Sequence, residues 1–471
     1  MFLNVRALAA TLYVSLNSTN PVPPYADWST ATTNIQDAVD ASTNRDLILV
    51  TNGLYQTGSR SDENGLLNRV TVTKAVSVES VNGPGVTMIV GNGVRCVYLT
   101  NDAVLLGFTL TNGSPSPTLE GLANGGGAWC EDDTSILSNC VITSNSAETG
   151  GGVYQGTLNN CWLTSNSAGE GGGGAFGTVL NNCVLNNNHT TGQLRGGGAY
   201  DVTMNNCLVV SNSSSGIGGG VVFGTLNNCI VVNNTGGGVA GCTMNNCIVY
   251  YNDSNFPNPG GYRYSTTWNA SDTTPLPNDF TDTASPDTIT NEPLFVNPAI
   301  GDFHLQSNSP CINSGNNTYV TSITDLDSNP RIAGGTVDIG AYEYQAPVSK
   351  ISYAWLQQYG LPITTNIDAA DLDDTGFTVY QDWIAGLNPT NSLSVLAMLS
   401  PVPTNNPVGL VVSWQSVSNR TYFLQSSTNL AAQPAFLTIQ SNIVGQPDVT
   451  SFMDTNAAGN GPFFYRVGVQ Q

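Results

Sequence analysis

Hydrophobic and polar positions in the middle third of the chain follow a repeating unit of 18 to 24 residues. Each copy has a glycine cluster, a short run of alternating apolar and polar side chains, a Ser-Asn or Asn-Asn pair followed by cysteine, and a second alternating run. The unit is clearest around Thr225-Leu226-Asn227-Asn228-Cys229. Because the glycines and the cysteines keep step through six copies, the pattern is a true internal repeat.

This period and these strand-length runs predict a parallel β-helix, because a propeller blade is longer and a leucine-rich repeat has a leucine pattern that the chain lacks. Equivalent residues then stack about 4.8 Å apart on successive turns. We expect the asparagines to turn a corner and bond from turn to turn, and the cysteines to pack inward, since a whole row of six disulfides is sterically unfavourable. The expected ladder comprises Asn139, Cys140, Asn160, Cys161, Asn182, Cys183, Asn206, Cys207, Asn228, Cys229, Asn246 and Cys247.

The two ends of the predicted coil carry different patterns. Residues 32–41 place their apolar side chains on one helical face, which predicts a short helix that caps the open end of the coil. Residues 253–290 are rich in Pro, Asp and Thr and predict a long loop. Residues 1–11 have a broken apolar run that ends in small side chains, which predicts either a signal-peptide remnant or a mis-set start codon.

Three segments near residue 340 carry a resemblance that the repeat alone does not. The segments Ser309-Pro310-Cys311-Ile312-Asn313-Ser314-Gly315, Asp325-Leu326-Asp327-Ser328-Asn329-Pro330-Arg331 and Asp338-Ile339-Gly340-Ala341-Tyr342-Glu343-Tyr344 resemble the closing module of bacterial secreted proteins called choice-of-anchor Q domain proteins. The opening Asn34-Ile35-Gln36-Asp37-Ala38 and the coils resemble the pectin-lyase-like right-handed β-helices to which that module is usually joined. The resemblance covers residues 12–345. It implies a right-handed coil and an extracellular location, and it does not indicate which activity the protein has.

Residues 346–395 predict a linker with a short helix and an acidic loop. The loop resembles the calcium loops of the EF-hand or thrombospondin type, in which side chains at positions 1, 3, 5 and 12 surround the ion. Asp371, Asp373, Thr375 and Asp382 occupy those positions here, so threonine and aspartate stand in for two of the usual ligands. The resemblance implies Ca²⁺ as a cofactor, and the alternative is a plain acidic turn.

Residues 396–471 contain alternating strands separated by turn signals at the spacing of a small β-sandwich. They resemble the fibronectin-type domains at the C-termini of bacterial surface proteins, which space, dock or bind. The predicted fold is therefore all-β: a right-handed parallel β-helix over residues 12–345 with an N-terminal capping helix, followed by a small C-terminal β-sandwich.

Composition narrows the range of partners. Charged residues make up 10% of the 471 residues, and the net charge of -21 is set against only 12 basic side chains. Nucleic acid and anionic membranes both need Lys and Arg to neutralise phosphate, so neither is an expected partner. An acidic polysaccharide is also repelled on average, unless a local basic site or a bound cation overcomes the repulsion. The sequence has no apolar run long enough to span a membrane.

The sequence contains few residues of the types that catalyse glycoside hydrolysis. His189 and His304 are the only two histidines, and His304 has only Asp302 as an acidic neighbour in sequence. A polygalacturonase-like hydrolase needs a pair of carboxylates, and this pattern does not supply one.

A polysaccharide lyase fits the sequence somewhat better. Glu148 and Glu170 each lie four residues before the last glycine of their cluster, and Arg195 lies close to the same column on the next turn. Such a column could hold Ca²⁺ and supply a base or a clamp for a uronate carboxylate. The plainer interpretation is that these are solvated residues at the corners of the coil.

Aromatic side chains form a second column. Trp129, Tyr154, Phe176 and Tyr200 each lie two residues after a glycine cluster. We expect an inward-facing core stack, because Val222 continues the column, whereas an outward-facing column would be a platform for stacking sugars.

These patterns favour an extracellular or cell-surface protein with a structural or adhesive role. Its long uncharged face would meet glycans, protein partners or copies of itself, and a repeated head-to-tail contact would give filaments. The alternative is a calcium-dependent polysaccharide lyase that uses Glu148, Glu170 and Arg195.

Overall fold

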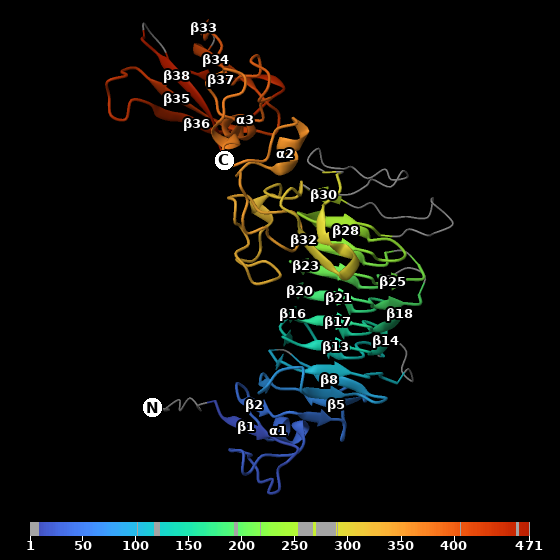
Figure 1. Ribbon diagram of the computed structural model, residues 1–471. Helices are drawn as coiled ribbons and strands as arrows, with labels where there is room; N and C mark the ends of the chain where they lie inside the picture. The colour runs from blue at the N-terminus through green and yellow to red at the C-terminus, as the bar shows by residue number, and fades with distance from the viewer. Residues whose placement is uncertain are drawn as a thin grey trace, which may run out of the picture. The chain divides into compact units, whose positions relative to one another are not determined.

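The computed structural model describes residues 9–100, 102–116, 123–192, 196–216, 218–252, 267–269, 289, 291–405, 407–457 and 461–470. The chain divides into two compact units, Met1–Ala346 and Pro347–Gln471. The first unit is the predicted right-handed parallel β-helix, whose strands stack turn upon turn (Figure 1). Among the described residues, no helix is long and apolar enough to cross a membrane.

Three sheets run along the coil, and apart from the hairpin pair β4 and β5 their strands pair in parallel. The first sheet contains β1 (Thr11–Val14), β2 (Leu47–Val50), β4 (Arg60–Ser61), β5 (Leu67–Val72), β6 (Ser77–Ser80), β8 (Arg95–Leu99), β9 (Val104–Leu106), β11 (Ala128–Cys130), β12 (Ile136–Ser138), β15 (Val153–Tyr154), β16 (Thr157–Asn159), β19 (Ala175–Phe176), β20 (Val179–Asn181), β23 (Ala199–Asn205), β26 (Val221–Asn227), β28 (Val239–Asn245) and β30 (Thr267–Asn269). The second sheet contains β3 (Gly53–Tyr55), β7 (Thr87–Val90), β10 (Thr109–Thr111), β13 (Val141–Thr143), β17 (Trp162–Thr164), β21 (Val184–Asn186), β24 (Leu208–Val210), β27 (Ile230–Val232) and β29 (Ile248–Tyr250). The third contains β14 (Ser146–Thr149), β18 (Ser167–Gly171), β22 (His189–Thr190) and β25 (Ser213–Ser214).

The Asn-Cys repeat forms the corner between the first and second sheets. The second asparagine of each pair has a left-handed backbone, with φ of 53° at Asn160 and 51° at Asn182, a conformation that asparagine tolerates better than most residues. The first asparagine bonds from turn to turn, as in Asn181 Nδ2 to Asn159 Oδ1 at 3.0 Å. The cysteines of the repeat point inward and are buried, with Cys183 fully shielded from solvent. The asparagines thus lie at a corner and the cysteines in the core, but most of the turn-to-turn bonds run through the first asparagine of each pair, whereas the predicted ladder consists of the second.

A second row of asparagines lies inside the coil, at the corner between the second and third sheets. Asn188 is fully buried, and its Nδ2 donates to Asn212 Oδ1 at 2.9 Å and to the carbonyl of Leu163 at 2.8 Å. Its Oδ1 accepts from Nδ2 of Asn166 at 2.9 Å. The same pattern continues through the inner asparagine ladder, which comprises Asn145, Asn166, Asn188, Asn212, Asn234 and Asn252. The spacing of the repeat did not predict this ladder.

Glycine clusters mark where the third sheet returns to the first. A Cβ atom on Gly152 would lie 2.4 Å from the carbonyl oxygen of Gly174 on the next turn, and one on Gly174 would lie 2.6 Å from that of Gly198. These distances are too short for any side chain, so the close stacking of turns requires glycine here.

Both ends of the coil carry additional elements. Helix α1 (Ile35–Ala41) buries Ile35, Ala38 and Val39, and Asn34 caps its first turn by accepting from the Gln36 amide. It packs against β1, β2 and β5, as expected for the capping helix. Residues 291–345, called the closing segment below, contain β31 (Phe295–Asn297), β32 (Asp302–Leu305), η1 (Pro298–Ile300) and η2 (Asn317–Tyr319). Most of the long loop expected at 253–290, and residues 1–8 of the expected signal remnant, lie outside the described residues.

The second unit contains the helical linker and a small β-sandwich. The linker has α2 (Tyr353–Gln358), η3 (Ile367–Ala369) and α3 (Val379–Ala385). The sandwich has one antiparallel sheet of β33 (Val402–Asn405), β34 (Val408–Ser416) and β37 (Asp448–Asp454), and a second of β36 (Leu437–Val444), β35 (Thr421–Ser427) and β38 (Phe464–Gln470). Trp414 from one sheet and Tyr422 and Leu424 from the other are buried between them.

Candidate functional site

The outer face of the second sheet carries the most exposed tryptophan among the described residues. Trp162 opens β17, and 58% of its surface is exposed, whereas the next residue, Leu163, points inward and is fully buried. Val141 and Val184 flank Trp162 in register on the neighbouring strands and are partly exposed. A large aromatic side chain therefore stands on a flat sheet surface where it costs solvation free energy and supports no core.

Amide side chains run beside this tryptophan. The corner asparagines Asn139, Asn160 and Asn182 each lie two residues before the flanking apolar position, on three successive turns. Asn139 and Asn160 are exposed and Asn182 is partly exposed. The surface formed by these three asparagines with Val141, Trp162 and Val184 is called the open face below. It combines hydrogen-bond donors with an apolar centre, which is the usual character of a ligand-binding surface.

The next three turns repeat the same pattern, but the closing segment covers them. Leu208, Ile230 and Ile248 continue the apolar row and are buried, with exposed fractions of 6%, 1% and 0%. Gly340 approaches this row so closely that a Cβ atom there would lie 2.9 Å from Cδ1 of Ile248.

The covered corner asparagines hold the main chain of the closing segment. The Nδ2 atoms of Asn246, Asn228 and Asn206 donate to the carbonyl oxygens of Asn316, Tyr319 and Thr324, at 2.9, 2.9 and 3.1 Å. Residues 316–324 thus run along the coil axis, across one turn after another. The three corner asparagines act as donors to main-chain oxygen atoms of a segment that runs along the coil and includes the 3-10 helix η2.

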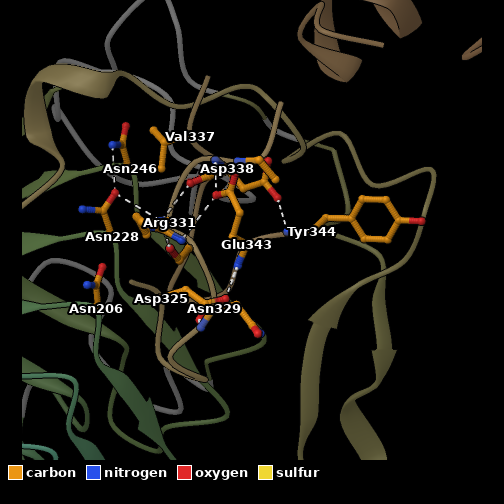
Figure 2. A network of polar contacts seen from close by, with 12 residues as sticks. Asn206, Asn228, Asn246, Asp325, Asn329, Arg331, Val337, Asp338, Glu343 and Tyr344 are labelled. Atoms are coloured by element: carbon orange, nitrogen blue, oxygen red, sulfur yellow. Dashed lines mark hydrogen bonds and ion pairs between the residues drawn. The ribbon is translucent and has the colours of Figure 1, made fainter. Parts of the chain in front are cut away.

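Arg331 locks the closing segment in place. It is 1% exposed, and its Nη2 donates to Asn228 Oδ1 at 3.2 Å and to the carbonyls of Asp338 and Gly340 at 3.0 and 2.6 Å (Figure 2). Its Nη1 lies 3.6 Å from Glu343 Oε2. A buried arginine therefore joins the corner of the coil to the last residues of the closing segment.

Two buried carboxylates, those of Asp338 and Glu343, belong to the same polar network as Arg331. Asp338 accepts from the amides of Asn313 and Tyr344 at 2.7 and 2.6 Å, and Glu343 accepts from the amide of Asp338 at 2.9 Å. Burial raises the pKa of Asp338 to about 7, and burial together with the charge of Asp338 raises the pKa of Glu343 to about 8. Asp325 in turn accepts from the Glu343 amide at 3.0 Å. The three segments that carried the sequence resemblance thus meet in one buried polar network, whose role is to hold the chain together.

The aromatic column faces outward, so the expected inward stack is wrong. The inward positions of these strands belong to the preceding small residues, such as Ala175 and Ala199, which are fully buried. The rings of Tyr154, Phe176 and Tyr200 are partly exposed and stack on one another, with centroids 5.3 and 5.1 Å apart and interplanar angles of 9° and 13°. Beside the tightly packed glycine clusters, small side chains fill the interior and large rings lie outside.

This stacking limits what the column can bind. Because neighbouring rings cover each other's faces, Tyr154, Phe176 and Tyr200 present mainly their edges to solvent. Trp129 packs edge-on to Tyr154 at 5.3 Å, and the guanidinium of Arg95 lies 4.7 Å above its ring. The role of these four residues in stacking sugars stays a prediction, and their geometry favours it less than that of Trp162.

The two glutamates of the predicted lyase column lie on neighbouring strands of the third sheet. Glu148 is on β14 and Glu170 on β18, which pair in parallel with a register shift at this position. Glu148 is partly exposed and Glu170 is exposed. The third member, Arg195, lies outside the described residues. The catalytic role of this column stays a prediction.

The acidic loop of the linker contains an unusual buried carboxylate. Asp382 on α3 is 1% exposed, and neither of its carboxylate oxygens has a hydrogen-bond partner. Burial, with the charges of Asp373 and Asp371, raises the pKa of Asp382 to about 6. Asp373 Oδ2 is also buried without a partner, while Thr375 Oγ1 donates to Asp373 Oδ1 at 2.8 Å.

These residues fit a bound cation. A buried, unpartnered carboxylate is costly unless an ion or a donor satisfies it, and calcium prefers oxygen ligands of this kind. In the part of the chain that the structure describes, however, no three His, Cys, Asp or Glu side chains already converge as a metal cluster. Any ion here would therefore draw on the threonine and on main-chain oxygens of the loop as well.

Sequence reasoning missed Trp162, although a signal was available. The first residue after Asn-Cys is Val141, Val184, Leu208, Ile230 and Ile248 in the other copies, and only this copy has an aromatic side chain there. A single tryptophan at an outward position of an aliphatic row indicates a role other than packing.

Comparisons with known proteins gave structural similarities only. No family model matches the chain, and the search of curated proteins gave no significant match. Among solved structures, the chain is similar to the pectate lyase Pel9A, with 16% identity and a TM-score of 0.46 over 72% of this chain and 97% of that one. It is also similar to a rhamnogalacturonan lyase, with 12% identity and a TM-score of 0.35 over 60% of this chain and 87% of that one. The fold assignment rests on the strand pairing of the chain itself.

Proposed function

We propose that this chain is an extracellular, adhesive β-helix protein that binds polysaccharide on the open face of its second sheet. The observation that carries the proposal is Trp162, which is 58% exposed on a flat sheet and bordered by corner amides. A sugar ring has an apolar face and a rim of hydroxyl groups, so it matches an aromatic ring next to hydrogen-bond donors.

Replacement of the tryptophan tests this proposal. We expect Trp162→Ala to weaken polysaccharide binding at least about tenfold, because the stacking surface is lost while the fold, which does not depend on this side chain, remains. Affinity gel electrophoresis against a panel of plant and microbial polysaccharides measures the effect. Trp28→Ala is the matched control, since Trp28 is also exposed, at 44%, but lies in the N-terminal loop against Tyr13. Equal binding by both variants and the unchanged chain would contradict the proposal.

A calcium-dependent polysaccharide lyase is the second candidate function. Its support is the position of Glu148 and Glu170 on paired strands of the third sheet, where two carboxylates can approach one cation. The test is the ultraviolet absorbance of unsaturated uronate released from polygalacturonate, with and without a chelator. Chelator-sensitive release that is lost in Glu170→Gln would establish the lyase, and the absence of release at any calcium concentration would exclude it.

We also propose that the linker loop binds Ca²⁺ through Asp371, Asp373, Thr375 and Asp382, supported by the buried, unpartnered oxygens of Asp382. Calcium added to the chelated chain should raise the temperature at which the second unit unfolds, because an ion that binds only the folded state stabilises it. Calorimetry with and without calcium measures the shift, which Asp382→Ala should abolish.

Self-association into filaments, expected from the repeated outer face of the coil, stays a prediction. Negative-stain electron microscopy of the purified chain distinguishes single rods from filaments.

A further inference from the structure

The closing segment indicates what kind of ligand the open face takes. Over the last three turns, the amides of Asn206, Asn228 and Asn246 donate to oxygens of a chain that lies along the coil axis. The apolar row beside them is buried, and Gly340 of the same segment lies against Ile230 and Ile248. The coil therefore already binds one chain that runs along its axis, through a row of amides and beside a row of apolar side chains.

The open face repeats this arrangement without a cover. Asn139, Asn160 and Asn182 continue the amide row, with left-handed φ values of 50°, 53° and 51° that match 51° at Asn206. Val141, Trp162 and Val184 continue the apolar row in register. Three turns at the spacing of paired strands extend over about 10 Å between the first and last amide, which is long enough for two or three linked sugar rings.

The charge pattern restricts the chemistry of that ligand. Residues 134–147, 156–169 and 178–191, which form the open face and the strands around it, contain no Asp, Glu, Lys or Arg. The chain as a whole carries a net charge of -21. A polyuronate or sulfated glycan would meet no positive charge on the open face and would be repelled by the rest of the protein.

From these observations we infer that the ligand of the open face is an extended, uncharged polysaccharide that lies along the coil axis. Its hydroxyl and ring oxygens accept from the amides of Asn139, Asn160 and Asn182, and one sugar ring stacks on Trp162. The inference rests on the proposed function and adds to it the class of polysaccharide, its direction and the three amides. The row of asparagines thus holds the protein's own main chain at one end and a glycan at the other.

Two asparagines at opposite corners of the second sheet, on neighbouring turns, give a matched test. Asn160→Asp keeps the size of the side chain and its tolerance of a left-handed backbone but replaces the amide donors with a carboxylate. Asn187→Asp makes the same change at an exposed residue with a φ of 54° at the other corner of the second sheet. Binding of cellulose oligomers, mannan, xyloglucan and polygalacturonate is measured by isothermal titration calorimetry at low and high salt.

We expect at least one neutral polysaccharide to bind, with an affinity that does not change with salt, because no charges are paired. Asn160→Asp should lower that affinity about tenfold or more, as for the loss of hydrogen-bond donors to a ligand, and Asn187→Asp should leave it unchanged. Circular dichroism of both variants establishes that the coil is intact.

Other results would overturn the inference in distinguishable ways. Binding of polygalacturonate alone, lost in Trp162→Ala, would contradict the uncharged ligand and leave the proposed function standing. If a neutral polysaccharide binds and neither Asn160→Asp nor Trp162→Ala changes its affinity, the binding site lies outside the open face. If none of the four polysaccharides binds, but a synthetic peptide of residues 316–324 does, the open face is a protein-docking surface and both the inference and the proposed function fail.

Discussion

His304 lies between two carboxylates and bonds to both. Its Nδ1 is 2.6 Å from Asp302 Oδ1 and its Nε2 is 2.6 Å from Asp327 Oδ2, while its ring packs against Tyr342 with centroids 4.2 Å apart. Both nitrogens can donate only when the ring is protonated. Burial lowers the pKa of His304, but the hydrogen bonds and charges of Asp327 and Asp302 outweigh it and raise the pKa above the ordinary value of 6.5. This histidine thus ties β32 to the loop at Asp327.

The protonation of His304 predicts a pH-dependent contribution to stability. A group whose pKa is raised on folding stabilises the protein fully below its unfolded-state pKa, and that contribution is lost as the pH rises through the folded-state pKa. Because the side chain is 46% exposed, we expect less than about 1 kcal/mol. Thermal unfolding from pH 5 to pH 9 should show His304→Gln less stable than the unchanged chain at pH 5 and equal to it at pH 9. A stability difference that persists at pH 9 would mean that His304 stabilises the protein by packing against Tyr342 and not by its charge.

At the scale of the elements, the inner asparagine ladder holds successive turns together. Asn188 satisfies the carbonyl of Leu163 and, through its Oδ1, the main-chain amide of Asn166 at 3.1 Å. Both groups are buried, and an unpaired buried polar group costs roughly 1–3 kcal/mol. We therefore expect Asn188→Ala to lower the free energy of unfolding by about 3 kcal/mol.

Urea denaturation followed by circular dichroism measures this loss. Asn186→Ala is the control, because Asn186 is the last residue of β21, two residues before Asn188, and its side chain is partly exposed. The control should change the unfolding free energy by less than about 0.5 kcal/mol, as is usual for surface positions. If the two variants lose the same stability, the inner ladder is no more important than the outer surface.

The repeat in the sequence predicted much of each turn and little of its surface. The spacing of the glycine clusters was enough to place Trp129 beside Tyr154 on neighbouring turns, a pairing that the structure has. The spacing could not predict whether the aromatic column faces into or out of the coil. A left-handed residue such as Gln155, with a φ of 57°, bends the strand and breaks the simple alternation of faces. The repeat pattern also could not predict the open face, since only the fold shows which turns the closing segment covers.

At the scale of the whole first unit, the buried network around Arg331 makes the closing segment sensitive to pH. One arginine faces Asp325, Asp338 and Glu343, so the network is best satisfied when the last two share at least one proton. Carboxylates with a raised pKa bind more protons in the folded state than in the unfolded state. Stability from this network is therefore greatest in acid and falls as the pH rises from about 4 through the folded-state values of about 7 and about 8.

This reasoning predicts that alkaline pH loosens the closing segment before the rest of the coil. Amide hydrogen exchange should be slow in residues 316–344 at pH 6 and markedly faster, after correction for the intrinsic rate, at pH 9, with little change in the inner asparagine ladder. Glu343→Gln removes one titrating group while keeping an acceptor for the Asp338 amide, so it should flatten this pH dependence. Glu63→Gln, at an exposed glutamate, is the control and should leave the dependence unchanged. Because the closing segment also covers Leu208, Ile230 and Ile248, its release would extend the open face from three turns to six. Exchange that rises equally throughout the coil would show instead that the network stabilises the unit as a whole.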